Sequence, residues 1–289
     1  MSQIFSFCNQ KGGVGKTTSA VNLSTLLAKE GYRVLLVDMD AQANATSGIG
    51  EEKPSIELTT YQLLVEKSDP KTLIKKTKIE NLDLIASNTD LSGAELELIQ
   101  HQNREFILKD QLQRLDNDYD FIFMDCPPSL GLITINCLTA SNYIIIPLQC
   151  EYYALEGLGQ LLHAYELVRK NLNTGLEIGG VILTMADFRT NLTQQVIEEV
   201  KNYFKDKVFG AIIPRSVKLS EAPSFGEPAV IYDPHNRGSI SYREVSKEFI
   251  SRFSPKTKTA PENSAKSELP AEQTEAETTH SQSSGGNAS

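Results

Sequence analysis

The chain has 289 residues, of which 40% are hydrophobic, so it is long enough to bury a sizeable core in one large domain or two small ones. Its formal net charge of −9 argues against a uniformly basic nucleic-acid-binding protein, although residues 189–253 form a region of positive net charge. No apolar run reaches the roughly 18 residues of a membrane span, and the N-terminus has no signal-peptide pattern, so a cytoplasmic protein is expected.

Short apolar runs alternate with helical patterns along most of the chain. Strands are predicted at residues 4–8, 34–38, 82–86, 121–125, 143–148, 178–184 and 208–213. Helices are predicted at residues 17–29, 60–66, 104–115, 134–140, 155–170, 192–204 and 240–253. Unbroken apolar strands that alternate with helices indicate an α/β fold of three layers, a mostly parallel twisted sheet with helices on both faces. Right-handed crossovers then place the carboxyl ends of the strands along one edge.

The composition changes near residue 255, where Ser, Thr, Pro, Glu, Gln and Gly become dominant. Such a segment cannot bury enough apolar surface to fold. We therefore expect a folded domain at residues 1–253 and a disordered polar tail at residues 254–289. The tail is either a dispensable segment or a tether.

Residues 9–18 read Asn-Gln-Lys-Gly-Gly-Val-Gly-Lys-Thr-Thr and join the first predicted strand to the first predicted helix. Backbone N–H groups of a glycine-rich loop and the N-terminus of a helix together bind phosphate. Lys16 would contact the β- and γ-phosphates, and the hydroxyl of Thr17 would bind Mg²⁺. Gln10 stands where the usual loop has glycine and is followed by a second lysine, Lys11. Lys11 is either a solvated surface lysine or a phosphate ligand that could serve another subunit.

Three carboxylates follow predicted strands and are expected at the same edge of the sheet. Asp125 ends an apolar strand and would hold Mg²⁺, through water. Asp38 would lie near the metal or the loop backbone, and Asp40 further out would position an attacking water. Alternatively, one of these two aspartates only caps the segment that follows it.

The four cysteines, Cys8, Cys126, Cys137 and Cys150, show no C-x-x-C spacing. We expect them to be reduced and buried, belonging neither to a disulfide framework nor to a metal site. A cluster assembled by folding is the less favoured alternative.

Three segments resemble the deviant Walker A, Walker A′ and Walker B motifs of the ParA/Soj chromosome- and plasmid-partitioning ATPases. They are residues 11–18 (Lys-Gly-Gly-Val-Gly-Lys-Thr-Thr), 37–48 (Val-Asp-Met-Asp-Ala-Gln-Ala-Asn-Ala-Thr-Ser-Gly) and 123–131 (Phe-Met-Asp-Cys-Pro-Pro-Ser-Leu-Gly). Further matches lie at residues 149–157, 183–192, 213–215 and 219–223. The resemblance covers residues 4–253 and is greatest to the short, Soj-like members.

The resemblance implies an ATP-driven sandwich dimer of a Mg²⁺-dependent ATPase, in which Lys11 reaches the nucleotide of the partner subunit. The nucleotide would be bound by Lys11, Gly12, Gly13, Val14, Gly15, Lys16, Thr17 and Thr18, with Pro214 packed against adenine. Lys11, Lys16 and Asp40 would act in catalysis, and Thr17, Asp38 and Asp125 would surround the metal.

The same resemblance implies that the ATP-bound dimer binds DNA nonspecifically through phosphate contacts from Arg189 and Lys218. A ParB-type centromere-binding protein would stimulate turnover, and the protein would be associated with the nucleoid. For Arg189, the alternative is a helix N-terminal arginine paired with a nearby carboxylate. The chain departs from the family pattern at Ala41 and Ala43, which replace Pro and Gly, and at Lys218, which replaces Arg and loses its bidentate geometry.

Two other functions remain open at this point. A membrane-recruited positioning ATPase of the MinD type would need a basic amphipathic helix at the C-terminus, whereas this chain ends in an acidic polar segment. A metabolic P-loop enzyme or an iron–sulfur reductase would need other segments or suitable cysteine spacing.

Overall fold

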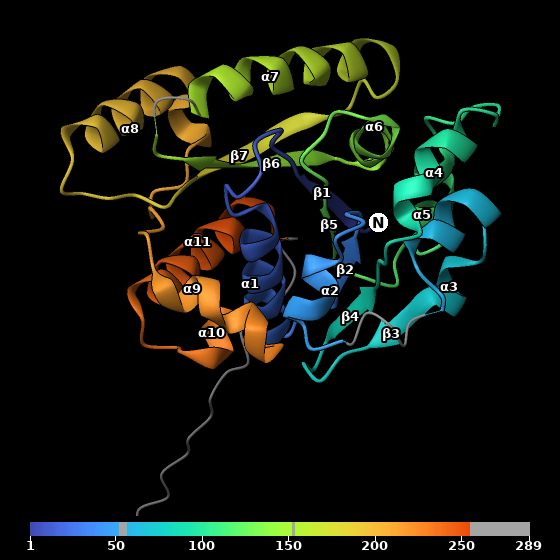
Figure 1. Ribbon diagram of the computed structural model, residues 1–289, viewed down its shortest axis with the longest axis horizontal. Helices are drawn as coiled ribbons and strands as arrows, with labels where there is room; N and C mark the ends of the chain where they lie inside the picture. Colours follow the sequence, from blue (N-terminus) through green and yellow to red (C-terminus); the bar gives the residue numbers. More distant parts are fainter. Residues whose placement is uncertain (52–56, 152–153, 255–289) are drawn as a thin grey trace, which may run out of the picture. The chain divides into compact units, whose positions relative to one another are not determined.

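A seven-stranded sheet in the order β3-β4-β2-β5-β1-β6-β7 forms the centre of the unit Met1–Ser254 (Figure 1). The computed structural model describes residues 1–51, 57–151 and 154–254. The strands are β1 (Gln3–Phe7), β2 (Val34–Asp38), β3 (Ile74–Lys76), β4 (Leu82–Ile85), β5 (Phe121–Asp125), β6 (Tyr143–Gln149) and β7 (Glu177–Thr184). All neighbouring strands run parallel except β3 and β4. The predicted mostly parallel α/β sheet is confirmed.

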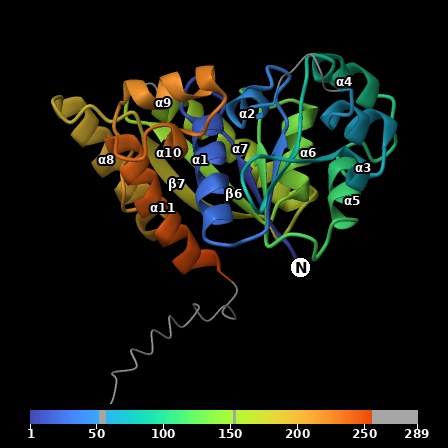
Figure 2. The ribbon, with the colours of Figure 1, turned by 90° about the horizontal axis from the view of Figure 1, so that it is seen from below.

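Helices cover both faces of this sheet (Figures 1 and 2). One face carries α1 (Lys16–Lys29), α2 (Asn44–Gly48), α10 (Ala229–Tyr232) and α11 (Arg237–Phe253). The other carries α4 (Leu91–Leu98), α5 (Ile107–Gln113), α6 (Leu132–Ala140), α7 (Ala154–Asn171) and α8 (Asn191–Phe204). Short elements complete the described chain: α3 (Pro70–Leu73), α9 (Val217–Glu221), the π-helical turn η2 (Gln62–Glu66) and the 3₁₀ turns η3 (Lys205–Lys207) and η4 (Ala222–Phe225).

The two cores follow from the alternation of side chains along each strand. On β5, Phe121 and Phe123 pack toward α1 and α11, while Ile122 and Met124 belong to the core beneath the opposite helices. Because every one of these side chains is buried, both faces of the strand must be apolar, and the sequence shows an unbroken apolar run. Phe249 of α11 closes an aromatic cluster with Phe121 and Phe123.

The strand predicted at residues 208–213 is wrong. This segment follows the edge of β7 through two isolated bridges, Val181 to Val208 and Ala186 to Pro214, without a continuous ladder. Backbone bonds from Phe209 to Val181 and from Ile213 to Leu183 leave the residues between them unpaired with β7. Phe209 packs over Gly180, where a Cβ would come within 2.4 Å of its ring.

Shorter elements also differ from the predictions. The strand β3 was not predicted, because three residues are too few to show an alternating pattern. The helix predicted at residues 60–66 is the π-helical turn η2, and the helix predicted at 104–115 is confined to α5. None of α2, α3, α4, α9 or α10 was predicted.

The ends of the described chain bear on two further expectations. Within the described ranges, no helix is long and apolar enough to cross a bilayer. The last described helix, α11, buries Val245 and Phe249 in the core that it shares with α1. The predicted polar tail lies outside the described residues except for Ser254, so its separation from the domain stays a prediction.

Candidate functional site

The loop between β1 and α1 is held by the ends of two neighbouring strands. Asn9 donates from Nδ2 to the carbonyl of Pro147 at 2.8 Å, and its Oδ1 accepts the backbone N–H of Lys11 at 3.1 Å. Thr184, the last residue of β7, donates its hydroxyl to the carbonyl of Val14 at 2.8 Å. The loop therefore has a defined shape before any ligand arrives, which lowers the entropy lost on binding.

The inner surface of this loop is open, and its backbone needs glycine at two points. Gly13 and Gly15 have φ values of +72° and +89°, in the region that L side chains rarely adopt. A Cβ at Gly12 or Gly13 would meet no atom of the described residues within 4 Å, so the backbone at these two glycines borders open space. Lys16 begins α1, and its ammonium donates to the carbonyl of Lys11 at 3.3 Å. This arrangement is an anion-binding cradle at a helix N-terminus.

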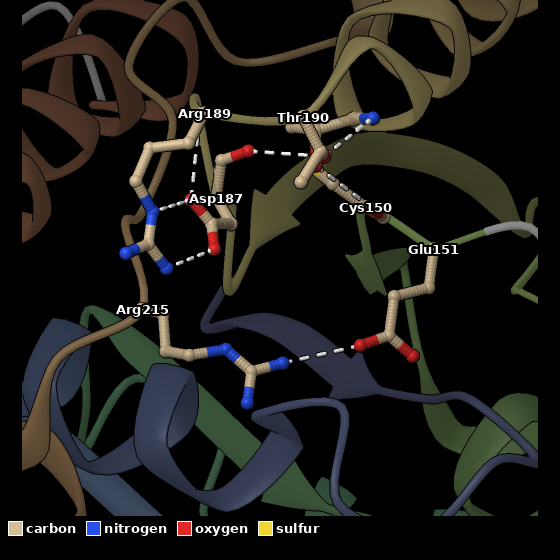
Figure 3. A network of polar contacts seen from close by, with 7 residues as sticks. Cys150, Glu151, Asp187, Arg189, Thr190 and Arg215 are labelled. Atoms are coloured by element: carbon tan, nitrogen blue, oxygen red, sulfur yellow. Dashed lines mark hydrogen bonds and ion pairs between the residues drawn. The ribbon is translucent and has the colours of Figure 1, made fainter.

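Lys11 lies on the rim of the cradle. Its side chain is 34% exposed, and its ammonium lies 3.5 Å from the carboxylate of Glu151. Glu151 follows β6 and also accepts a hydrogen bond from Arg215 at 3.1 Å (Figure 3). From the sequence, Lys11 was expected to be either solvated or in contact with a phosphate. Its ion pair with Glu151 was not predicted, because nothing in the local sequence links residues 11 and 151.

Asp125 is the buried carboxylate of the site. It ends β5 and lies level with Phe7 of β1 and Asp38 of β2 in the parallel registers. Neither carboxylate oxygen has a hydrogen-bond partner of good geometry among the described residues, although the nearby Thr17 hydroxyl partly favours the charged form. Burial, together with the negative charge of Asp38, raises the pKa of Asp125 well above its usual range. A buried carboxylate with unpaired oxygens fits a cation, so the residues present are suited to Mg²⁺.

Asp38 and Asp40 organise the segment that follows β2. Asp38 accepts the backbone N–H of Asp40 at 3.1 Å on one oxygen, and both the N–H and the hydroxyl of Thr46 at 2.8 Å on the other. Burial raises the pKa of Asp38 to about 6. Asp40 is less buried and accepts the N–H of Gln42 at 3.0 Å. Asp38 therefore holds α2 against the sheet, the structural role that the sequence left as the alternative for one of the two aspartates.

A cavity of about 400 Å³ extends from the loop toward the segment after residue 213. Gly15, Thr17 and Thr18 line one side, and Pro214 lines the other. The predicted adenine-packing residue is thus brought next to the predicted phosphate ligands, although 196 residues separate Thr18 from Pro214 in the chain. A cavity of this size is typical of a small-ligand site.

The predicted DNA-binding residues lie on two adjacent segments near this cavity. Ala186 forms a bridge to Pro214, so the loop bearing Arg189 runs beside the segment that leads to Lys218. Arg189 is 87% exposed and forms a bidentate pair with Asp187, with contacts of 2.8 and 2.6 Å (Figure 3). These hydrogen bonds lower the pKa of Asp187 to about 2. The carboxylate partner that the sequence offered as the alternative for Arg189 is therefore present.

Lys218 is also paired, with Glu221 one helical turn away at 3.0 Å, and it lies over the ring of Tyr232 at 5.6 Å. Exposed pairs of this kind are weak, so they do not prevent either cation from exchanging its carboxylate for a phosphate.

Folding brings two of the cysteines together, as in the cysteine cluster that the sequence left as the less favoured alternative. The Sγ atoms of Cys8 and Cys126 lie 3.0 Å apart, because each follows a strand that ends at the same level of the sheet. All four cysteines are free and buried, as expected. Burial, together with a hydrogen bond to Cys126, raises the pKa of Cys137 well above its usual range.

Most of the chain is similar in sequence to known proteins. The AAA domain family matches residues 2–178. The sporulation initiation inhibitor protein Soj of Bacillus subtilis is 57% identical over 248 residues, which cover 86% of this chain and 98% of that protein. The chromosome partitioning protein ParA of Myxococcus xanthus is 49% identical over 257 residues, covering 89% and 91%.

Two solved structures are similar as well. A Borrelia burgdorferi structure described as a putative plasmid partition protein bound to AMPPNP has a TM-score of 0.75 at 32% identity, covering 87% of this chain and 99% of that one. A Mycobacterium smegmatis structure described as cobyrinic acid a,c-diamide synthase with ADP and magnesium has a TM-score of 0.75 at 34% identity, covering 86% and 93%.

The contact between Thr184 and the loop gives a testable prediction. Thr184→Val removes the hydroxyl and leaves the carbonyl of Val14 without its donor, so the free energy of unfolding should fall by about 1–3 kcal/mol in urea denaturation. Amide hydrogen exchange at residues 12–16 should become faster. Thr184→Ser keeps the donor and should keep the loop protected. Equal exchange in the two variants would show that the hydroxyl does not hold the loop.

Proposed function

The chain belongs to the ParA/Soj family of chromosome-partitioning ATPases, and on this premise we propose that its ATPase cycle is a dimerisation switch that controls DNA binding. The observation that carries the proposal is the pairing of a preformed phosphate cradle with a second lysine on its rim. Lys16 lies inside the cradle with 6% exposure, whereas Lys11 is partly exposed and can reach another molecule.

ATP with Mg²⁺ is the ligand that this site fits. The loop residues Gly12, Gly13, Val14 and Gly15 would surround the phosphates with their N–H groups, and Thr18 and Pro214 would line the path to the base. Lys16 would neutralise phosphate charge. Solved relatives with ADP and magnesium, or with an ATP analogue, support this assignment.

Mg²⁺ would be held near the Thr17 hydroxyl and the unpaired carboxylate of Asp125. When bound, the metal would neutralise the charge that develops on the transferred phosphoryl group. Asp38 would lie beside the metal site, and its two carboxylate oxygens already accept hydrogen bonds from the backbone N–H groups of Asp40 and Thr46. Asp40, on the more exposed part of the loop, would orient the attacking water.

Lys11 distinguishes the switch from an ordinary hydrolase, which leads to a prediction. Lys11→Ala should leave ATP affinity within about twofold of the wild type, because the cradle and Lys16 remain. It should abolish the ATP-dependent dimer, as measured by light scattering at increasing protein concentration. Lys16→Ala is the comparison variant and should lose ATP binding itself. A Lys11→Ala protein that still dimerises with ATP would contradict the role of this lysine.

DNA would be bound by the surface formed by the loop that bears Arg189 and the segment that bears Lys218. We call this surface the DNA edge. Both side chains belong to the region of positive net charge, and the two segments run side by side through the bridge from Ala186 to Pro214. Two copies in a dimer would present two such edges to one duplex. Contacts made to phosphates alone would be independent of base sequence and sensitive to salt.

Charge reversal at this edge tests the DNA role. Arg189→Glu should weaken ATP-dependent binding to a random duplex by at least about tenfold at low salt and should reduce the salt dependence by about one ion per protomer. Arg169→Glu, at an exposed arginine near the end of α7, is the matched control and should bind as the wild type does. Equal losses in both variants would point to net charge and not to this edge.

A ParB-type centromere-binding protein would be the partner that resets the switch, and the protein would be found on the nucleoid while ATP-bound. Adding that partner with DNA should raise the ATPase rate several-fold at saturating ATP, as measured by phosphate release. Asp40→Ala should remain inactive in the same assay. Stimulation by vesicles in place of DNA would support the MinD-type alternative. The apolar face of α11 is buried in the core with α1, so this face is not free to bind a membrane. This favours DNA over a membrane as the surface that the protein binds.

A further inference from the structure

Glu151 connects the loop lysine to a second cation. Its two carboxylate oxygens divide between the ammonium of Lys11 at 3.5 Å and the guanidinium of Arg215 at 3.1 Å. Glu151 follows β6, and its side chain extends toward Arg215 (Figure 3). The side chain of Glu151 is 44% exposed.

We propose that Glu151 is a positioning residue that holds Lys11 against its own subunit until ATP binding and dimerisation release it. This inference rests on the proposed function, in which Lys11 contacts the nucleotide of a second copy. The ammonium must then give up its contact with Glu151 when it reaches toward the partner. The pair opposes dimerisation slightly, and the phosphate charge of ATP in the partner supplies the competing attraction.

Arg215 lowers the cost of moving Lys11 from Glu151 to the nucleotide of the second copy. If Lys11 were the sole cation at Glu151, its departure would leave this carboxylate without a partner. Arg215 already donates to the other oxygen, so Glu151 stays paired after Lys11 has left. Among the described residues, the charges in contact with this group are Lys11 from the loop and Arg215 from the segment before α9, and Asp187, from the loop after β7, interacts in turn with Arg215.

Removing the Glu151 carboxylate should change the stability of the dimer only modestly. Exposed ion pairs are individually weak. A two-fold symmetric dimer would release two such pairs, one from each subunit, so removing the carboxylate should tighten the dimer by about 2- to 30-fold.

The test compares Glu151→Gln with the wild type in a dimerisation assay with a non-hydrolysable ATP analogue. Analytical ultracentrifugation at low salt should give a dimer dissociation constant about 2- to 30-fold lower for the variant, and the difference should shrink as salt rises. The affinity of the monomer for nucleotide and the melting temperature should stay unchanged, which separates positioning of Lys11 from a general effect on the fold.

Asp187→Asn is the matched control, because it removes a neighbouring carboxylate that pairs with Arg189 and not with Lys11. It should leave the dimer dissociation constant unchanged. An equal or weaker dimer for Glu151→Gln, or the same tightening in Asp187→Asn, would overturn the inference. If the wild type itself fails to dimerise with the analogue, the proposed switch fails, and that outcome is distinct from a normal wild type with an unaffected Glu151→Gln.

Discussion

The position of β1 between β5 and β6 is the constraint on which the site depends. The loop after β1 has the carboxylate of Asp125 on one side, and on the other the carbonyl of Pro147, to which Asn9 donates. A parallel order brings these strand ends to one level without any further adjustment. The buried aromatic and aliphatic side chains on both faces keep β1 in that place, so the packing of the core also sets the geometry of the cradle.

Charges around the cradle fall into two classes with different functions. Inside, Lys16 and Asp125 are almost fully buried and form no ion pair with another described residue, although Lys16 donates to the carbonyl of Lys11, and this suits them to a ligand and its metal. Lys11 on the rim, and Arg189 and Lys218 on the nearby segments, each have a carboxylate partner. Buried charges without an ion pair give affinity for the nucleotide, whereas exposed pairs can exchange at little cost, which suits contacts that form and break in a cycle.

Several expectations from the sequence agree with the structure because their signals are local. The loop at residues 9–18, the strand ending in Asp125 and the helix α1 are each recognisable from consecutive residues. The strand predicted at residues 208–213 failed because this apolar run pairs with its neighbours only through two isolated bridges, and a run of apolar residues does not reveal where backbone pairing is interrupted. The proximity of Cys8 and Cys126 was only the less favoured expectation, because it depends on the register of β1 with β5 and not on any spacing in the sequence.

By itself, the sequence determined the fold class, the nucleotide loop and the family, because these depend on residue types at short, fixed spacings. Only the tertiary structure decided which distant groups come into contact. Lys11 pairs with Glu151, the Thr184 hydroxyl donates to the carbonyl of Val14, and Thr18 lines the same cavity as Pro214. The two residues of each pair are well over a hundred positions apart in the chain. Contacts at such separations arise from strand order and register, which the amino-acid pattern specifies only through the packing of the whole core.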